Sequence, residues 1–252
     1  MIFKQLMVCI CLMFLVSCKT KTLNLTKIEG KEIPISAELP PDQDIANFIK
    51  PYHDHVINTL DSTLAYAPET YSKDNGTFNT AIGNLMADVI YEQANPIFKS
   101  RTGHDIDFVL LNKGGIRAPI SKGNITLRTA YEIMPFENSV VVAAIKGKNV
   151  NAAMTYLSQA KSAHPVSKLK LAINSDFDVV EALVKGKAID ENKTYYVATN
   201  DYLYNGGDHM TFFKPNDSVY DLNYKLRNAF IDYFTKVDTI NPVIDDRFIQ
   251  IK

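Results

Sequence analysis

Residues 80–94, TAIGNLMADVIYEQA, and residues 107–111, DFVLL, decide the class of fold. The first stretch predicts a helix with one apolar face, because apolar residues recur at helical spacing: Ile82, Leu85, Met86, Val89 and Ile90. The second stretch is a short apolar run bounded by polar residues, which is typical of a buried strand. A helix with one apolar face packed on such a strand indicates a mixed α and β fold.

The flanking sequence continues this mixture of helices and strands. Four more strands are expected, at Ser139–Ile145, Leu169–Ile173, Val179–Val184 and Tyr195–Thr199. Three more helices are expected, at Asp42–Tyr66, Asn149–Ala160 and Leu222–Phe234. Pro51 should kink or split the first of these helices, and Lys185-Gly186-Lys187 should turn one strand into the next. The order supports a single α+β domain over residues 42–252.

The first residues are typical of an exported lipoprotein. Lys4 precedes the apolar run Leu6–Leu15, which falls short of the ~20 residues that a spanning helix needs. The run closes with Leu15-Val16-Ser17-Cys18, which resembles a lipobox and predicts a signal peptide over residues 1–18 with lipidation of Cys18. A plain secretory signal cleaved nearby and a short anchor helix are the alternatives.

Two further expectations follow from this segment. Residues 19–41 are polar and contain three prolines, which predicts an extended tether between the lipid anchor and the domain. Lys19 directly after the cysteine favours the outer membrane as the final location. The three cysteines, Cys9, Cys11 and Cys18, all lie in the predicted signal segment, so the domain itself has no thiol for a disulfide or a soft metal.

Charge argues against a polyanionic partner. The net charge is −1, and acidic and basic residues are interspersed, so the surface offers no strong positive field. A nucleic acid polymer is therefore not an expected partner.

The first segment suited to ligand binding directly follows the predicted strand at 107–111. It reads LNKGGIR, in which Gly114 and Gly115 let the backbone approach a ligand closely, and Arg117 offers a rigid fork for phosphate or carboxylate oxygens. An ordinary turn after a strand is the alternative.

Two later segments carry aromatic and polar side chains in loops. Phe136 and Asn138 stand at the entry of a predicted strand, where a ring is able to stack on a base or simply to plug the end of the strand. Tyr202 and Asp208 lie in NDYLYNGGD, residues 200–208, which offers an aromatic face and a carboxylate suited to a polyol, or else a solvated turn. A fourth segment, IGNLMAD, is interpreted as a structural helix start.

In this order and spacing, the motifs GNLMAD, NKGGIR, PFEN and NGGD resemble the C-terminal domain of the 5'-nucleotidase family. The resemblance covers about Ile45 to Pro215. It implies layers in the order helix, sheet, sheet, helix, and a nucleotide pocket on one face. Composition and spacing alone indicate only α+β.

The resemblance also implies a role for each residue of the pocket. Asn112 and Arg117 would lie beside the substrate, with the guanidinium near its phosphate. Phe136 and Tyr202 would clamp the base between two rings, which tolerates any base and is worth roughly 1 to 3 kcal/mol per base. Asp208 would accept hydrogen bonds from the ribose hydroxyls.

Some positions are assigned more loosely or depart from the family pattern. Asn138 would bind a base edge. The family commonly carries an arginine shortly before the GNL segment, whereas this chain reads KDNGTFN there, so the phosphate grip rests on Arg117 alone or with help from Lys73. Tyr202 replaces the more usual phenylalanine, which adds a hydroxyl to the stacking face.

The family's metal-binding half has no counterpart in the motifs of this chain. There, Asp, His and Asn side chains bridge two metal ions that activate a water. Here His53 and His55 are the only paired histidines, and residues two apart on a helix point in nearly opposite directions. No catalytic residue, metal ligand or cofactor is expected in this chain, and a divalent metal is expected only in a separate metallophosphoesterase partner.

Three hypotheses follow for function. The leading one makes the chain the nucleotide-binding part of a 5'-nucleotidase-type hydrolase system, active only with the metallophosphoesterase. The second is a surface lipoprotein that binds nucleosides or nucleotides for scavenging without catalysis. The third is a structural lipoprotein whose pocket is a relic.

Overall fold

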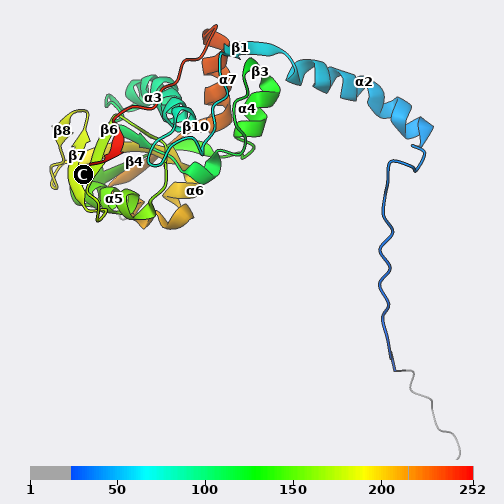
Figure 1. Cartoon of the computed structure of the whole chain (residues 1–252), viewed down its shortest axis with the longest axis horizontal. Coiled ribbons are helices and arrows are strands. Elements are labelled where there is room, and N and C mark those ends of the chain that lie inside the picture. Colours follow the sequence, from blue (N-terminus) through cyan, green and yellow to red (C-terminus); the bar gives the residue numbers. More distant parts are fainter. Residues whose placement is uncertain (1–23, 215, 252) are drawn as a thin grey trace, which may run out of the picture. The chain divides into compact units, whose positions relative to one another are not determined.

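Residues 24–214 and 216–251 are described by the computed structural model (Figure 1), and the chain divides into two units, Met1–Ile49 and Lys50–Lys252. The predicted signal peptide, Cys18 and the first five residues of the predicted tether lie outside the described residues. From residue 24 to residue 42 the chain forms no helix or strand, and its side chains are exposed. Within the described part, no helix has the length and apolarity needed to cross a membrane.

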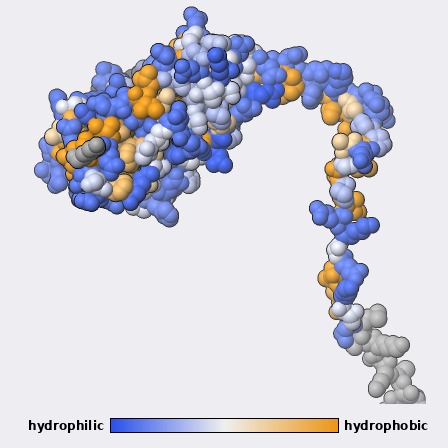
Figure 2. Space-filling model, viewed as in Figure 1, coloured by the Kyte–Doolittle hydropathy of each residue, from blue (hydrophilic) through white to orange (hydrophobic). Residues whose placement is uncertain are grey.

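Helix α2, Gln43–Leu60, is continuous through Pro51, which corrects the predicted helix Asp42–Tyr66. Residues Thr63–Ala67 form strand β1 instead, because they pair antiparallel with β3, Gly123–Thr126, a partner that local spacing does not reveal. No residue of α2 is buried. Figure 2 shows apolar surface along this part of the chain. The exposed large apolar residues of the helix are Ile45, Phe48, Ile49, Tyr52 and Val56.

The second unit contains two larger sheets. The five-stranded sheet has the strand order β10 (Ser218–Lys225), β4 (Ser139–Lys146), β9 (Thr194–Asn200), β2 (Phe108–Leu110) and β5 (Val166–Ser167). Its β2 and β9 are parallel, and its other neighbours are antiparallel. The four-stranded sheet has the order β11 (Phe248–Gln250), β6 (Leu169–Ile173), β7 (Val179–Val184) and β8 (Lys187–Ala188).

The alternation of side chains along β2 separates two hydrophobic cores. Val109 and Leu111 face a core that includes residues of α3 (Ala81–Thr102) and α7 (Leu226–Lys236). Phe108 and Leu110 face a second core shared with α5 (Gly147–Ala160) and the four-stranded sheet. The five-stranded sheet therefore has helices on one face and a helix with a second sheet on the other, which confirms the α+β class.

Several element boundaries differ from the prediction. Helix α3 begins after Thr80, whose side chain accepts a hydrogen bond from the backbone N–H of Gly83, and it continues through Pro96 to end at Gly103 in a left-handed conformation. The predicted helix Leu222–Phe234 begins only at residue 226, because β10 pairs with β4 up to that point. Strands β6 and β7 have the predicted bounds, and the turn between β7 and β8 lies where Lys185-Gly186-Lys187 placed it.

Shorter elements that were not predicted lie beside the loops of interest. They are α4 (Leu127–Ile133), α6 (Asp201–Tyr204) and the 3-10 helices η1 (Lys113–Gly115), η2 (Gly207–His209) and η3 (Thr211–Phe213).

Candidate functional site

Three loops meet at one edge of the five-stranded sheet. The loops at 112–117 and 201–208 follow the parallel strands β2 and β9, and the segment 134–138 precedes β4, which is antiparallel to β9. All three therefore leave the sheet at the same edge.

A pocket of about 360 Å³ lies between these loops. It is lined by all eight residues that the sequence assigned to a ligand, namely Asn112, Gly114, Gly115, Arg117, Phe136, Asn138, Tyr202 and Asp208. Met134 and Asn200 complete the lining, and the sequence did not single them out. The side chain of Asn200 accepts a hydrogen bond from the backbone N–H of Leu203, which caps α6.

The carboxylate of Asp208 is held on both oxygens. The side-chain amide of Asn112 donates to Oδ2 at 2.7 Å, and the hydroxyl of Tyr202 donates to Oδ1 at 2.8 Å. The hydroxyl of Tyr156 donates to the carbonyl of Asp208 at 2.8 Å, and Asp208 itself has a left-handed backbone with φ of 51°. Each carboxylate oxygen keeps a further lone pair, so a fixed acceptor pair remains for hydroxyl groups of a ligand.

Two aromatic side chains remain partly open. Phe136 is 44% exposed and Tyr202 is 49% exposed, so Phe136 does not plug the end of β4. The ring of Tyr202 packs on Gly207 so closely that a Cβ there would lie 2.4 Å from a ring atom, so any larger residue would displace the ring. The hydrogen bond to Asp208 raises the pKa of the Tyr202 hydroxyl.

Among the described residues, Arg117 is the only cationic side chain in the lining of this pocket. Its guanidinium donates to the carbonyl of Gly114 at 3.2 Å and lies 5.8 Å from the centre of the Phe136 ring. Lys73 lies outside the lining, where its ammonium donates to the carbonyl of Ile116 at 2.8 Å. Lys113 pairs with Asp74 at 2.8 Å. The positive charge available to an anionic ligand is therefore small.

Behind the pocket lies His164, to which the sequence assigned no role and which is 6% exposed. Its Nδ1 accepts from the backbone N–H of Lys113 at 3.4 Å, and the ring of Tyr156 lies against it with centres 5.8 Å apart. Burial lowers the pKa of His164, although the charge of Asp208 opposes this shift. His164 and Tyr156 support the loops that carry Lys113 and Asp208, and their distance in sequence from both loops hides that role.

The described residues do not fit a metal centre. Residues 24–214 and 216–251 contain no group of three or more His, Cys, Asp or Glu side chains placed to bind an ion. His53 and His55 are exposed on α2.

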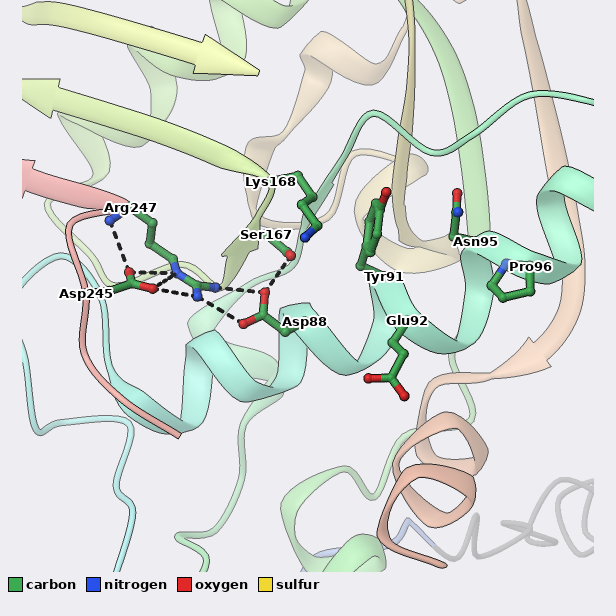
Figure 3. A pocket seen from close by; sticks show the side chains of 9 residues that line it. All are labelled: Asp88, Tyr91, Glu92, Asn95, Pro96, Ser167, Lys168, Asp245 and Arg247. Carbon is green, nitrogen blue, oxygen red and sulfur yellow. Dashed lines mark hydrogen bonds and ion pairs between the residues drawn. The ribbon is translucent and has the colours of Figure 1, made fainter. Parts of the chain in front are cut away.

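The GNLMAD segment lies away from this pocket and fastens the C-terminal part of the chain. The side-chain amide of Asn84 donates to the carbonyl of Val243 at 2.9 Å. Asp88 accepts from Arg247 at 2.9 Å and from the hydroxyl of Ser167 at 2.5 Å. Figure 3 shows the guanidinium of Arg247 between Asp88 and Asp245, beside a pocket of about 600 Å³. These contacts agree with the structural interpretation of the segment.

Comparison with known proteins places residues 56–215 in the family described as "5'-nucleotidase, C-terminal domain". The chain is 27% identical over 198 residues to the trifunctional nucleotide phosphoesterase protein YfkN of Bacillus subtilis, covering 69% of this chain and 13% of that protein. It is 34% identical over 111 residues to protein UshA of Escherichia coli, covering 43% of this chain and 20% of that protein.

Among solved structures, a 5'-nucleotidase precursor from Thermus thermophilus matches with a TM-score of 0.69 and 26% identity. This match covers 84% of the present chain and 44% of the Thermus chain. The chain thus spans well under two thirds of the length of the relatives it matches. The matched residues include all three loops of the pocket, and the chain belongs to the 5'-nucleotidase C-terminal domain family.

Proposed function

We propose that the pocket binds a nucleoside or nucleotide, and that the chain is the substrate-binding part of a 5'-nucleotidase-type hydrolase system that releases phosphate from nucleotides. The observation that carries the proposal is the meeting of two half-exposed rings and one fixed carboxylate in the lining of a single pocket. Rings of this kind stack on a base, and a carboxylate is suited to the two hydroxyls of ribose. The chemistry of the lining therefore matches the two neutral parts of a nucleotide.

Each lining residue has a place in this proposal. Phe136 and Tyr202 hold the base and Asp208 holds the ribose. Asn112 and Arg117 lie beside the phosphate, where the guanidinium forms a charged hydrogen bond. Gly114 and Gly115 let the ligand approach the backbone, and Asn138 binds an edge of the base.

Hydrolysis is proposed to need a separate metallophosphoesterase. Members of this family pair the present domain with an N-terminal metallophosphoesterase domain, and the chain corresponds to 44% of the Thermus 5'-nucleotidase chain. We place the divalent metal ions in that partner, where they would activate a water. Lipidation at Cys18 would hold the chain at the outer membrane.

Calorimetry with adenosine tests the binding proposal. The purified chain should bind adenosine, and Phe136→Ala and Tyr202→Ala should each weaken binding by about 2 kcal/mol, roughly thirtyfold, through loss of a stacking face. Tyr66→Ala is the matched control, because Tyr66 is similarly exposed and lies outside the pocket. No detectable binding to the wild type would refute the proposal.

Phosphate release tests the hydrolase system. A secreted metallophosphoesterase is assayed on nucleotides with a divalent metal, with and without the present chain. We expect faster release with the chain present, and a smaller gain with Phe136→Ala. A mixture no faster than the metallophosphoesterase alone would exclude that protein as the partner.

The alternative function is binding of nucleosides for scavenging without catalysis. It is favoured by the lining of the pocket, in which the part of the chain that the structure describes supplies a single cationic side chain, since a phosphate is usually bound by more positive charge. Comparing adenosine with its monophosphate separates the two. If Arg117 binds a phosphate, Arg117→Met should weaken binding of the nucleotide and leave binding of the nucleoside unchanged. Equal affinity for both ligands, unchanged by the substitution, favours scavenging.

A further inference from the structure

The segment Met134–Asn138, which carries Phe136 into the pocket, has no regular secondary structure. Its backbone carbonyls instead accept hydrogen bonds from the start of α7, about ninety residues later in the chain. The guanidinium of Arg227 donates through Nη1 to the carbonyls of Met134, at 3.4 Å, and Pro135, at 3.2 Å. Its Nη2 also pairs with the carboxylate of Glu137. Arg227 therefore holds the chain on both sides of Phe136.

The two residues before Arg227 complete this attachment. The ammonium of Lys225 donates to the carbonyl of Glu137 at 2.7 Å, and the backbone N–H of Leu226 donates to the carbonyl of Asn138 at 3.0 Å. Four carbonyls of the segment are thus bound by three consecutive residues of the chain. A loop held in this way keeps one conformation without belonging to a sheet.

Burial distinguishes Arg227 from an ordinary surface cation. It is 5% exposed, and its guanidinium lies 4.1 Å from the centre of the Tyr131 ring. Its Nε is buried and has no hydrogen-bond partner among the described residues. A buried guanidinium with an unpaired N–H is a poor source of stability, because desolvation offsets much of what its contacts contribute. Its contacts do, however, define where the loop lies.

We propose that Arg227 is a positioning residue for the Phe136 ring, fixing the wall of the pocket against which a base stacks. The inference rests on the proposed function, because it takes the ring to be the stacking face. Its physical basis is preorganisation: a ring already held in place loses little freedom when the ligand binds. Met134 and Asn138, which also line the pocket, are fixed by the same set of contacts.

A double-mutant cycle tests whether Arg227 acts through the ring. Adenosine affinity is measured for the wild type, Arg227→Met, Phe136→Ala and the double variant. We expect Arg227→Met to weaken binding about tenfold in the wild-type background and less than about twofold in the Phe136→Ala background. An equal loss in both backgrounds, or no loss in either, would overturn the proposal.

Two controls separate positioning from stability. Arg247→Met removes another partly buried guanidinium that lies outside the pocket, so it should leave adenosine affinity unchanged. Glu137→Gln keeps the carbonyl contacts of Arg227 and should weaken binding less than Arg227→Met does.

Amide hydrogen exchange gives a readout that needs no ligand. In Arg227→Met, peptides covering residues 134–139 should exchange faster, while those from the centre of β4 keep their protection. Unchanged exchange at residues 134–139 would overturn the positioning role by itself. Failure of the wild type to bind adenosine would instead count against the proposed function, and the exchange result would still decide the role of Arg227.

Discussion

Two pockets of the described chain, one beside α3 and one between the three loops, differ in how fully their polar groups satisfy one another. The pocket of about 600 Å³ beside α3 is rich in charge, yet Arg247 there binds Asp88, Asp245 and the carbonyl of Val166. The pocket of about 360 Å³ is smaller, and it leaves two rings half exposed, while the guanidinium of Arg117 donates to a backbone carbonyl. Volume alone would favour the first pocket as a ligand site. The two half-exposed rings, which no other side chain covers fully, favour the second.

The first prediction tests the structural side of this comparison and has the largest expected effect. Arg247→Met should reduce the free energy of unfolding by about 3 kcal/mol, because it leaves Asp88 and Asp245 without their shared cation. Urea denaturation measures the loss. If the variant had normal stability but bound adenosine more weakly, the larger pocket would be the ligand site and the structural interpretation of Arg247 would be wrong.

The second prediction concerns sugar recognition in the smaller pocket. Asp208→Asn should weaken adenosine binding by about 2 kcal/mol, because a charged acceptor for the hydroxyls is lost and the new amide N–H₂ group faces one of the two donors, Asn112 or Tyr202. Calorimetry with adenosine and 2'-deoxyadenosine should show the preference for ribose shrinking. An unchanged ratio between the two ligands would remove Asp208 from sugar recognition.

The third prediction concerns the pH dependence of stability, which should differ between His164, behind the smaller pocket, and Asp245, beside α3. Burial lowers the pKa of His164, so the folded chain keeps its imidazole neutral while the unfolded chain takes up a proton below about pH 6.5. The free energy of unfolding should therefore fall as the pH drops below that value, by up to about 1.4 kcal/mol per pH unit. His164→Gln should flatten this slope in denaturation curves, and an equally steep slope in the variant would assign it to other groups.

The contribution of Asp245, in the pocket beside α3, to the free energy of unfolding should be lost at a lower pH than that of His164. Burial opposes the ionisation of Asp245, but hydrogen bonds from Arg247 outweigh it and lower the pKa of this carboxyl. Its contribution to stability is present above about pH 3.8 and is lost as the pH falls through its pKa in the folded chain. The Arg247→Met variant should lack this acid-side loss.

The fourth prediction has the smallest effect. Tyr202→Phe keeps the ring and removes its hydrogen bond to Asp208, so adenosine should bind about 1 kcal/mol more weakly, roughly fivefold. The affinity for free adenine, which has no sugar to contact Asp208, should fall by less. A loss as large as that of Tyr202→Ala would show that the hydroxyl, and not the stacking face, is the main contribution.

Much of the fold followed from local patterns, and the errors lie where pairing with distant strands decides. Strands β6 and β7 have the expected bounds because their apolar runs end at turns. Residues 63–66 and 222–225 were expected to be helical, but β1 pairs with β3 and β10 pairs with β4. The spacing of apolar residues in a short segment does not reveal a strand partner that lies far away in the sequence.

The residues of the smaller pocket were predictable because motifs mark them, while their supports were not. Asn112, Phe136 and Asp208 stand in loops with unusual composition. Tyr156 and Arg227 lie in the middle and at the start of ordinary amphipathic helices, and only the fold brings their polar ends to the loops. Sequence pattern thus identified the residues that line the pocket and missed the residues that hold them.

The close packing of the Tyr202 ring on Gly207 provides a genetic tool. Replacing Gly207 by alanine adds one methyl group and alters no charge, yet it forces the Tyr202 ring, whose hydroxyl bonds Asp208, to move. A cell carrying this allele would produce a chain in which one wall of the pocket is displaced. Comparing its growth on nucleotides with that of a deletion strain would test whether the proposed function needs this pocket or only the presence of the chain.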